Sequence, residues 1–298
     1  MKITGLFITL MIGFISLNSL AQEALSPYFK VADLTGNIED ANVQITNIIS
    51  TAGFEVIGEY DPAEKQELKV ICFTNNELKK LSLQFADRGA LASVLKAALV
   101  KENDKITVSI LNPEYMFLAY WGEQLVGQEG QLDAMSDKVI NAFSKLGKLE
   151  PYGGFEKRDD LPDYHYMMMM PYFSDPVELN EFSSFEEGLK TIRKNLEAKT
   201  GSTVKVFEQV FDGKEIAVFG VGLWDKETGE GAFLPTIGEG HIANLPYEII
   251  LQGKMATMLH GKYRIALYWP ELKMGTFMKI SSTPGEIEDT MKALCGAE

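Results

Sequence analysis

The chain has 298 residues, with 28 Lys and Arg against 42 Asp and Glu, and a formal net charge of −14. This length is sufficient for two domains that each bury a hydrophobic core. The acidic charge excludes nucleic acids and anionic membrane surfaces as expected partners, because both are recognised through clusters of cationic side chains.

The first residues have the pattern of a secretory signal. Lys2 gives a short basic start, residues 3–17 form an apolar run, and Ser19-Leu20-Ala21 provides the small residues that a signal peptidase inspects. We therefore expect a signal peptide over residues 1–21 and export to the periplasm or the medium. The run is short for a full membrane span and no comparable run follows, so the mature chain is expected to have no membrane span.

The first half of the mature chain is predicted to combine strands and helices. Asn37 is placed to cap a helix, because Ile38, Ala41, Ile45 and Ile49 recur on one face at helical spacing. Strands are expected at 28–34, 54–60, 68–73, 95–101 and 105–111, and a closing helix at 134–146.

The second half is predicted to repeat this plan. After an opening strand at 165–172, Ser183 or Ser184 caps a helix, with a Glu three residues further on. A hairpin turns at Asp212-Gly213. The other expected elements are strands at 204–211, 215–223, 246–252 and 262–269, and a final helix at 287–294.

The parallel order of patterns predicts an internal duplication. Ile38 matches Phe185, Leu95 matches Leu245 and Pro113 matches Pro270, at an offset that grows slowly along the chain. We expect one repeat over 22–149, a linker rich in Pro and Gly over 150–163, and a second repeat over 164–298. Each repeat reads as β-α-β-β-β-β-α, so the expected fold class is α+β, with antiparallel sheets and helices on one face.

Short motifs in both halves are similar to those of a known family. Gly53-Phe54 leads from a helix into a strand, Phe219-Gly220 ends a strand, and Leu245-Pro246 opens one. With Asn112-Pro113, these residues resemble the domain-of-unknown-function 302 family, which adopts a TATA-binding-protein-like β-α-β4-α fold. The resemblance implies two tandem copies of that fold. The family has no established activity, so the resemblance implies no catalytic residues.

One candidate metal site lies in the run of methionines. On the expected strand at 165–172, alternation places His165, Met167 and Met169 on one face. An imidazole with two thioethers could hold Cu(I). The alternative, which we favour, is a buried strand in which methionine is an adaptable filler. We therefore predict no cofactor, with Cu(I) as the alternative.

A second candidate is Glu239 with His241, which stand beside glycines in a predicted loop. Such a pair could serve as a general acid and base or as half of a metal site. No third ligand stands at a recognisable spacing, and the sequence contains no Gly-x-Ser-x-Gly, His-Glu-x-x-His or Cys-x-x-Cys motif. Whether the protein is an enzyme stays open, with the balance against it.

The two cysteines stand in different halves. Cys72 lies in an apolar run, where a buried and unreactive side chain is expected. Export would permit a disulfide with Cys295, but the sequence alone does not decide whether the two are paired.

Aromatic residues provide the last candidate site. Tyr115, Trp121, Tyr268 and Trp269, together with His241, could line a cleft for an apolar or planar ligand, or else fill the two cores. Our leading hypothesis is an exported, non-enzymatic protein that holds a small apolar or amphipathic ligand, or a partner segment, between its repeats. The alternatives are a metal-handling protein or enzyme of the envelope, and a purely structural envelope component.

Overall fold

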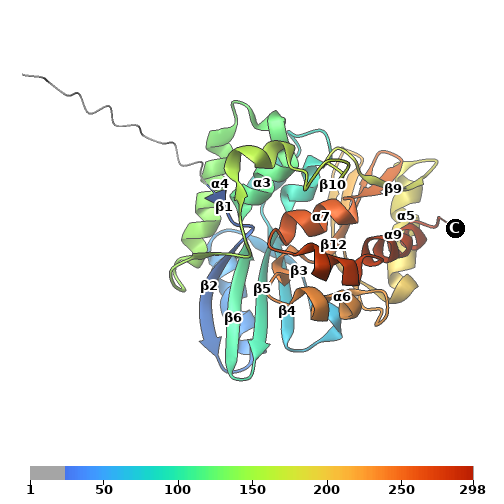
Figure 1. Cartoon of the computed structure of the whole chain (residues 1–298). Helices are drawn as coiled ribbons and strands as arrows, with labels where there is room; N and C mark the ends of the chain where they lie inside the picture. The colour runs from blue at the N-terminus through green and yellow to red at the C-terminus, as the bar shows by residue number, and fades with distance from the viewer. Residues whose placement is uncertain (1–23, 298) are drawn as a thin grey trace, which may run out of the picture.

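The computed structural model describes residues 24–297, apart from the side chain of Glu123. The expected signal peptide lies outside these residues. The described chain forms two larger antiparallel sheets with helices packed against them (Figure 1), which confirms the α+β class. No helix within residues 24–297 is long and apolar enough to cross a membrane.

The first half is built around one sheet with the strand order β3-β4-β5-β6-β2-β7. Its elements are β2 (Tyr28–Thr35), α1 (Ile38–Thr51), β3 (Glu55–Tyr60), β4 (Leu68–Thr74), α2 (Asn76–Ser82), β5 (Leu95–Glu102), β6 (Lys105–Leu111), α3 (Pro113–Trp121), α4 (Glu129–Phe143) and β7 (Glu150–Tyr152). Helix α1 begins as predicted, because the Asn37 side chain accepts a hydrogen bond from the backbone N of Asp40 at 2.7 Å. Its apolar face packs on β3, β4 and β5.

The second half is built around a sheet with the strand order β10-β11-β12-β13-β9. Its elements are β9 (Val177–Glu181), α5 (Phe185–Glu197), β10 (Thr203–Phe211), β11 (Ile216–Leu223), α6 (Glu230–Ile237), β12 (Tyr247–Gln252), β13 (Met255–Met258), α7 (Gly261–Tyr268), α8 (Met274–Phe277) and α9 (Thr283–Leu294). Strand for strand, this is the order of the first sheet without β7. A short pairing of β1 (Ala24–Leu25) with β8 (Glu156–Lys157) lies apart from both sheets.

The two sheets meet at matching edge strands. The pairing of β3 with β4 is irregular between Val56 and Gly58, and the pairing of β10 with β11 is irregular between Lys205 and Phe207. A Cβ atom on Gly58 would lie 2.1 Å from the carbonyl oxygen of Val206. The close approach of the two edges therefore depends on a glycine at this position.

Each half also covers part of the other sheet. The 3-10 segment Gly89–Ser93 of the first half contacts β11 and β12, and the 3-10 segment Ile242–Asn244 of the second half contacts β5 and β6. The buried apolar residues accordingly form one cluster that runs through both halves. Cys72 and Cys295 are both buried and unpaired, and burial is what the sequence predicted for Cys72.

Two predicted strands are wrong. Residues 165–172 form bends and turns, in which the backbone N of Met170 donates to the carbonyl of Met167 at 2.9 Å, and the opening strand of the second half is β9. Residues 262–269 lie almost entirely in helix α7. The match of Pro113 with Pro270 is therefore also wrong, because Pro113 begins α3 whereas Pro270 follows the end of α7.

Candidate functional site

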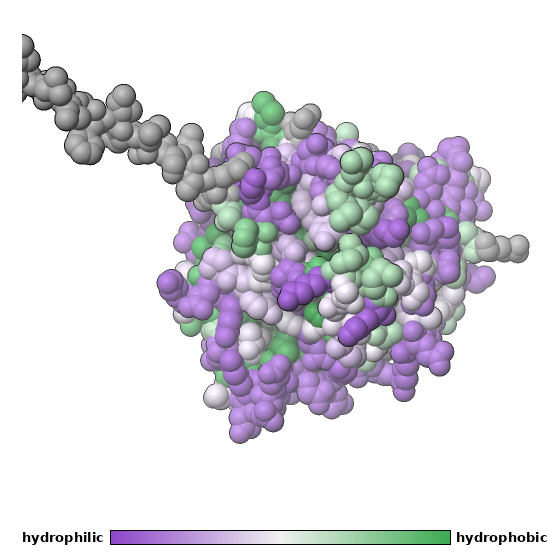
Figure 2. Space-filling view, in the orientation of Figure 1, coloured by the Kyte–Doolittle hydropathy of each residue, from purple (hydrophilic) through white to green (hydrophobic). Residues whose placement is uncertain are grey.

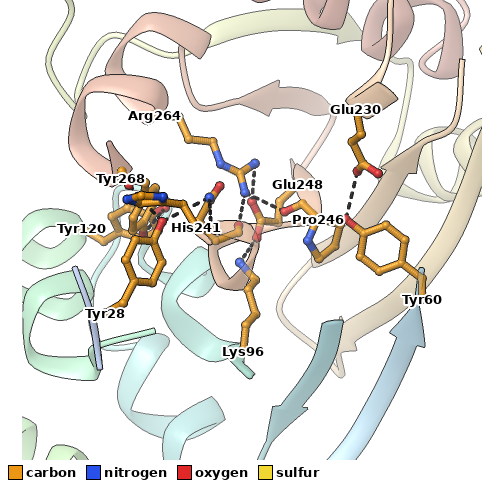
Figure 3. A network of polar contacts seen from close by, with 11 residues as sticks. Tyr28, Tyr60, Lys96, Tyr120, Glu230, His241, Pro246, Glu248, Arg264 and Tyr268 are labelled. Atoms are coloured by element: carbon orange, nitrogen blue, oxygen red, sulfur yellow. Dashed lines mark hydrogen bonds and ion pairs between the residues drawn. The ribbon is translucent and has the colours of Figure 1, made fainter. Parts of the chain in front are cut away.

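A buried ion cluster joins the two halves. Lys96 of β5 forms an ion pair with Glu248 of β12, and the Arg264 guanidinium of α7 lies 3.0 Å from the same carboxylate (Figure 3). None of the three side chains is more than 5% exposed. Arg264 also donates to the carbonyl oxygens of Asn244 and Pro246. Burial acts to lower the pKa of Arg264, but Glu248, Tyr247, Tyr120 and Tyr268 together outweigh this effect, and the net pKa is raised.

Glu230 of α6 is a second buried carboxyl group at the contact of the halves. It accepts hydrogen bonds from Tyr60 Oη at 2.9 Å, from the backbone N of Ala63 at 2.7 Å and from the backbone N of Leu223 at 3.2 Å. Burial raises its pKa to about 7, although these three hydrogen bonds act to lower it. Since Tyr60 and Ala63 belong to the first half, this carboxyl group links the halves.

The aromatic residues and His241 that the sequence singled out lie at or near the same contact, and all of them are buried. They are Tyr115, Trp121, His241, Tyr268 and Trp269. The Tyr115 hydroxyl donates to the carbonyl of Leu267 at 2.7 Å, and the Tyr268 hydroxyl donates to Tyr120 Oη at 2.9 Å. These two tyrosines therefore connect α3 with α7 by hydrogen bonds between buried groups.

Glu239 and His241, which the sequence predicted as a functional pair, have different partners in the structure. Glu239 forms an ion pair with Lys65 of the first half, whereas His241 Nε2 lies 2.6 Å from Glu271 Oε1. Burial acts to raise the pKa of Glu271, but the His241 hydrogen bond and charge prevail and lower it. Glu271 was not predicted as a site residue, because it stands far from His241 in the chain and the Pro270-Glu271 pair gives no indication of this contact.

The imidazole ring of His241 is packed among aromatic rings. Its ring centroid lies 5.3 Å from those of Tyr28 and Tyr152 and 5.4 Å from that of Trp269. Figure 3 shows Tyr28, Tyr120 and Tyr268 grouped beside His241, on one side of the ion cluster. Because its Nε2 faces Glu271, whose side chain is 46% exposed, this pair reaches the surface at the carboxylate only.

An apolar groove opens beside these buried groups, between α7, the segment after it and the run of methionines. Its cavity volume is about 70 Å³, and about 460 Å³ when the open solvent at its mouth is included. The lining residues are Tyr166, Met167, Met170, Lys262, Ile265, Ala266, Trp269, Leu272, Met274 and Phe277. We call it the methionine groove. Figure 2 shows the face that carries α7, where hydrophobic side chains gather between hydrophilic ones.

Trp121 and Trp269 have different surroundings, although one ends α3 and the other follows α7. Trp121 borders a separate hollow, and its Nε1 donates to the carbonyl of Gly89 at 3.1 Å. Trp269 lines the methionine groove, and its Nε1 has no hydrogen-bond partner among the described residues. Of the five predicted ligand-binding residues, Trp269 is the one that borders this groove.

The residues of the predicted copper site lie in three different environments. His165 packs its ring against Tyr172 at 4.3 Å and borders an acidic hollow, Met167 lines the methionine groove, and Met169 is 95% exposed. The strand that was expected to align them is absent from 165–172. Across residues 24–297, no group of three His, Cys, Asp or Glu side chains is arranged to hold a metal ion.

No family model and no curated protein matches the chain. A solved structure, the uncharacterized conserved protein DUF302 from Bacillus stearothermophilus, is similar at 9% sequence identity and a TM-score of 0.34. The alignment covers 40% of this chain and 98% of that chain. Its name is that of the family that the sequence motifs resemble, and a similarity at this level carries no argument about activity.

Proposed function

We propose that this chain is an exported, non-enzymatic protein that binds a small apolar or amphipathic ligand in the methionine groove. The observation that carries the proposal is the groove itself, in which nine of the ten lining residues are apolar or aromatic. Ligand sites are usually concave and mainly apolar, with a few polar groups that fix orientation. The methionine groove has this composition on the surface of a strongly acidic protein.

The exposure of the lining side chains supports a binding role. Met167, Met274 and Tyr166 are 46%, 47% and 41% exposed, and they lie together rather than scattered over the surface. Large apolar side chains gathered in the open mark interaction sites more often than single exposed ones do. Methionine is flexible and polarizable, so a surface of this kind adapts to ligands of different shape. The groove lies beside the segment that joins the halves, whereas the aromatic residues between the halves are buried.

We further propose that the groove belongs to a chain made of two tandem repeats similar to the DUF302 domain, with repeats at 22–149 and 164–298. The shared strand order and the matching irregularities in β3 and β10 support this proposal. In a duplicated chain, one copy can keep a structural role while the equivalent site in the other copy changes. Here the indole of Trp121 is fixed by a hydrogen bond, whereas Trp269 lines the methionine groove.

Binding of a neutral hydrophobic fluorescent dye tests the proposed function. The variant Met167→Asp places a charge in the groove, and its matched control Met168→Asp places the same charge on the next residue, which is 82% exposed and does not line the groove. We expect dye binding to be lost in Met167→Asp and retained in Met168→Asp. A protein that binds no dye, or two variants with equal effects, contradicts the proposal.

A further inference from the structure

We infer that the ligand of the methionine groove is a single-chain amphiphile with an anionic head group, and that Lys262 binds this head group. The inference rests on the proposed function, since it assigns a chemical class to the ligand of the same groove. Lys262 is the one charged side chain among the residues that line the groove. An apolar groove with a single cationic side chain is complementary to a molecule with an apolar tail and a single negative charge.

The Lys262 ammonium group is available for such a ligand. Within residues 24–297 it forms no ion pair and no hydrogen bond, although its backbone N donates to His260 Nδ1 at 3.2 Å. The pKa of His260 is lowered by burial and by the Lys262 charge, which places this charge close to the imidazole. Glu288 and Asp175 act on His260 in the opposite direction, and within residues 24–297 neither forms an ion pair with Lys262. An unpaired cation beside apolar surface binds an anion more strongly than one fully surrounded by water.

The charges around the groove also indicate at which end of the groove the head group binds. On one side, Tyr166 is shared with a hollow whose lining includes Glu156, Asp160 and Asp163. An anionic head group is repelled from that side, because like charges at close range disfavour each other. Lys262 does not border this hollow. The head group is therefore expected at Lys262, with the tail along Trp269 and the methionine side chains.

The test compares three probes with the same tail: dodecanoate, 1-dodecanol and dodecyltrimethylammonium. Each is titrated into the purified protein below its aggregation concentration, and binding is followed by calorimetry and by displacement of the neutral dye. We expect dodecanoate to bind most tightly and the cationic probe most weakly. We also expect higher salt to weaken the binding of dodecanoate and to leave that of 1-dodecanol unchanged, because salt screens charge–charge contacts.

Lys262→Gln removes the charge and keeps most of the side chain, and Lys214→Gln at the exposed β10–β11 turn is the matched control. We expect Lys262→Gln to weaken dodecanoate binding by about two- to fivefold, the range of an exposed charge pair, with 1-dodecanol unaffected. Equal binding of dodecanoate and 1-dodecanol, or no effect of Lys262→Gln, overturns the inference and leaves the proposed function standing. If none of the three probes binds and the dye does not bind either, the proposed function fails with it.

Discussion

Tyr268 donates a hydrogen bond to the hydroxyl of Tyr120 at 2.9 Å, and the two tyrosines hold equivalent positions in their halves. Tyr120 is the eighth residue of α3 and Tyr268 is the eighth residue of α7. A residue that contacts its own counterpart lies at a local twofold axis, as in the interface of a symmetric dimer. The halves of this chain therefore meet, at this point, in the manner of two equal subunits.

Tyr115 and Tyr263 extend this symmetry and give a first prediction. Each is the third residue of its helix; Tyr115 donates to the carbonyl of Leu267 at 2.7 Å, and Tyr263 donates to the carbonyl of Ala119 at 3.1 Å. We expect Tyr115→Phe and Tyr263→Phe to lower the free energy of unfolding by a similar amount, about 1 kcal/mol each. Urea denaturation measures this loss. Tyr166→Phe, at a 41% exposed position, is the control with an expected change near zero.

The stabilities of Tyr115→Phe and Tyr263→Phe test whether the two contacts are equivalent. If one tyrosine is important and its counterpart is dispensable, the two contacts are not equivalent and the symmetric interface is only apparent. If both variants unfold in one transition, the halves form a single cooperative unit, which their shared apolar cluster predicts.

The buried ion cluster leads to a second prediction. Glu248→Gln leaves the charges of Lys96 and Arg264 buried without a counter-charge, and this is expected to cost about 3–5 kcal/mol. Lys96→Met is expected to cost less, because the pair of Arg264 with Glu248 remains. Glu181→Gln breaks an exposed pair with Lys254 and is expected to cost less than about 1 kcal/mol. The three variants are compared by the midpoints of urea denaturation, and equal costs for Glu248→Gln and Glu181→Gln contradict the prediction.

Sequence periodicity was sufficient where one face of an element is buried. Helices α1 and α5 were predicted with their caps, because Asn37 and Ser184 precede helices that bury one stripe. It failed at α7, where Tyr263, Ile265 and Leu267 alternate as in a strand although Arg264 and Tyr268 are buried as well. A short helix that is buried on several sides has no period that distinguishes it from a buried strand.

The helices α2, α3, α6 and α8 were not predicted. For α3 the reason is the same as for α7. From Tyr115 to Trp121 all of its residues are buried, so no polar face marks the helical turn. The candidate site was found only in part. Met167 and Trp269 were singled out from the sequence, but Lys262 and Glu271 reach their places through tertiary packing that no local pattern records.

Glu230 gives a prediction about pH. Burial raises its pKa in the folded protein to about 7, while in the unfolded chain it has the ordinary value of about 4.5. At a pH between these two pKa values, Glu230 is protonated in the folded state and ionised in the unfolded state. The free energy of unfolding is then expected to fall as the pH rises through this window, by up to about 1.4 kcal/mol per pH unit. The contribution is fully present below about pH 4.5 and lost above about pH 7.

Glu230→Gln removes this titration. We expect the thermal midpoint of the variant to depend less on pH between about 4.5 and 7 than that of the parent protein. Glu197→Gln, at the exposed end of α5, is the control and should keep the parent slope. A parent protein whose midpoint is constant through the window, or rises with pH at a slope that Glu230→Gln leaves unchanged, shows that Glu230 does not carry a raised pKa.

The two tryptophans allow a final prediction that separates a structural indole from one beside a ligand site. Trp121 is stacked between Phe85 and Phe117, with centroid distances of 4.3 Å to each, and its Nε1 donates to the carbonyl of Gly89. Trp121→Phe loses this hydrogen bond and leaves a cavity, so a loss of at least about 1 kcal/mol in the free energy of unfolding is expected.

Trp269→Phe loses no hydrogen bond among the described residues, because Nε1 of Trp269 has no acceptor there. Its cost is expected to be smaller than that of Trp121→Phe, since only the cavity contribution remains. Because Trp269 lines the methionine groove, Trp269→Phe should instead weaken binding of the neutral dye, which Trp121→Phe leaves unchanged. Denaturation and dye titration on both variants therefore yield opposite rankings. The same ranking in both measurements would mean that Trp269 affects the dye only through the stability of the fold.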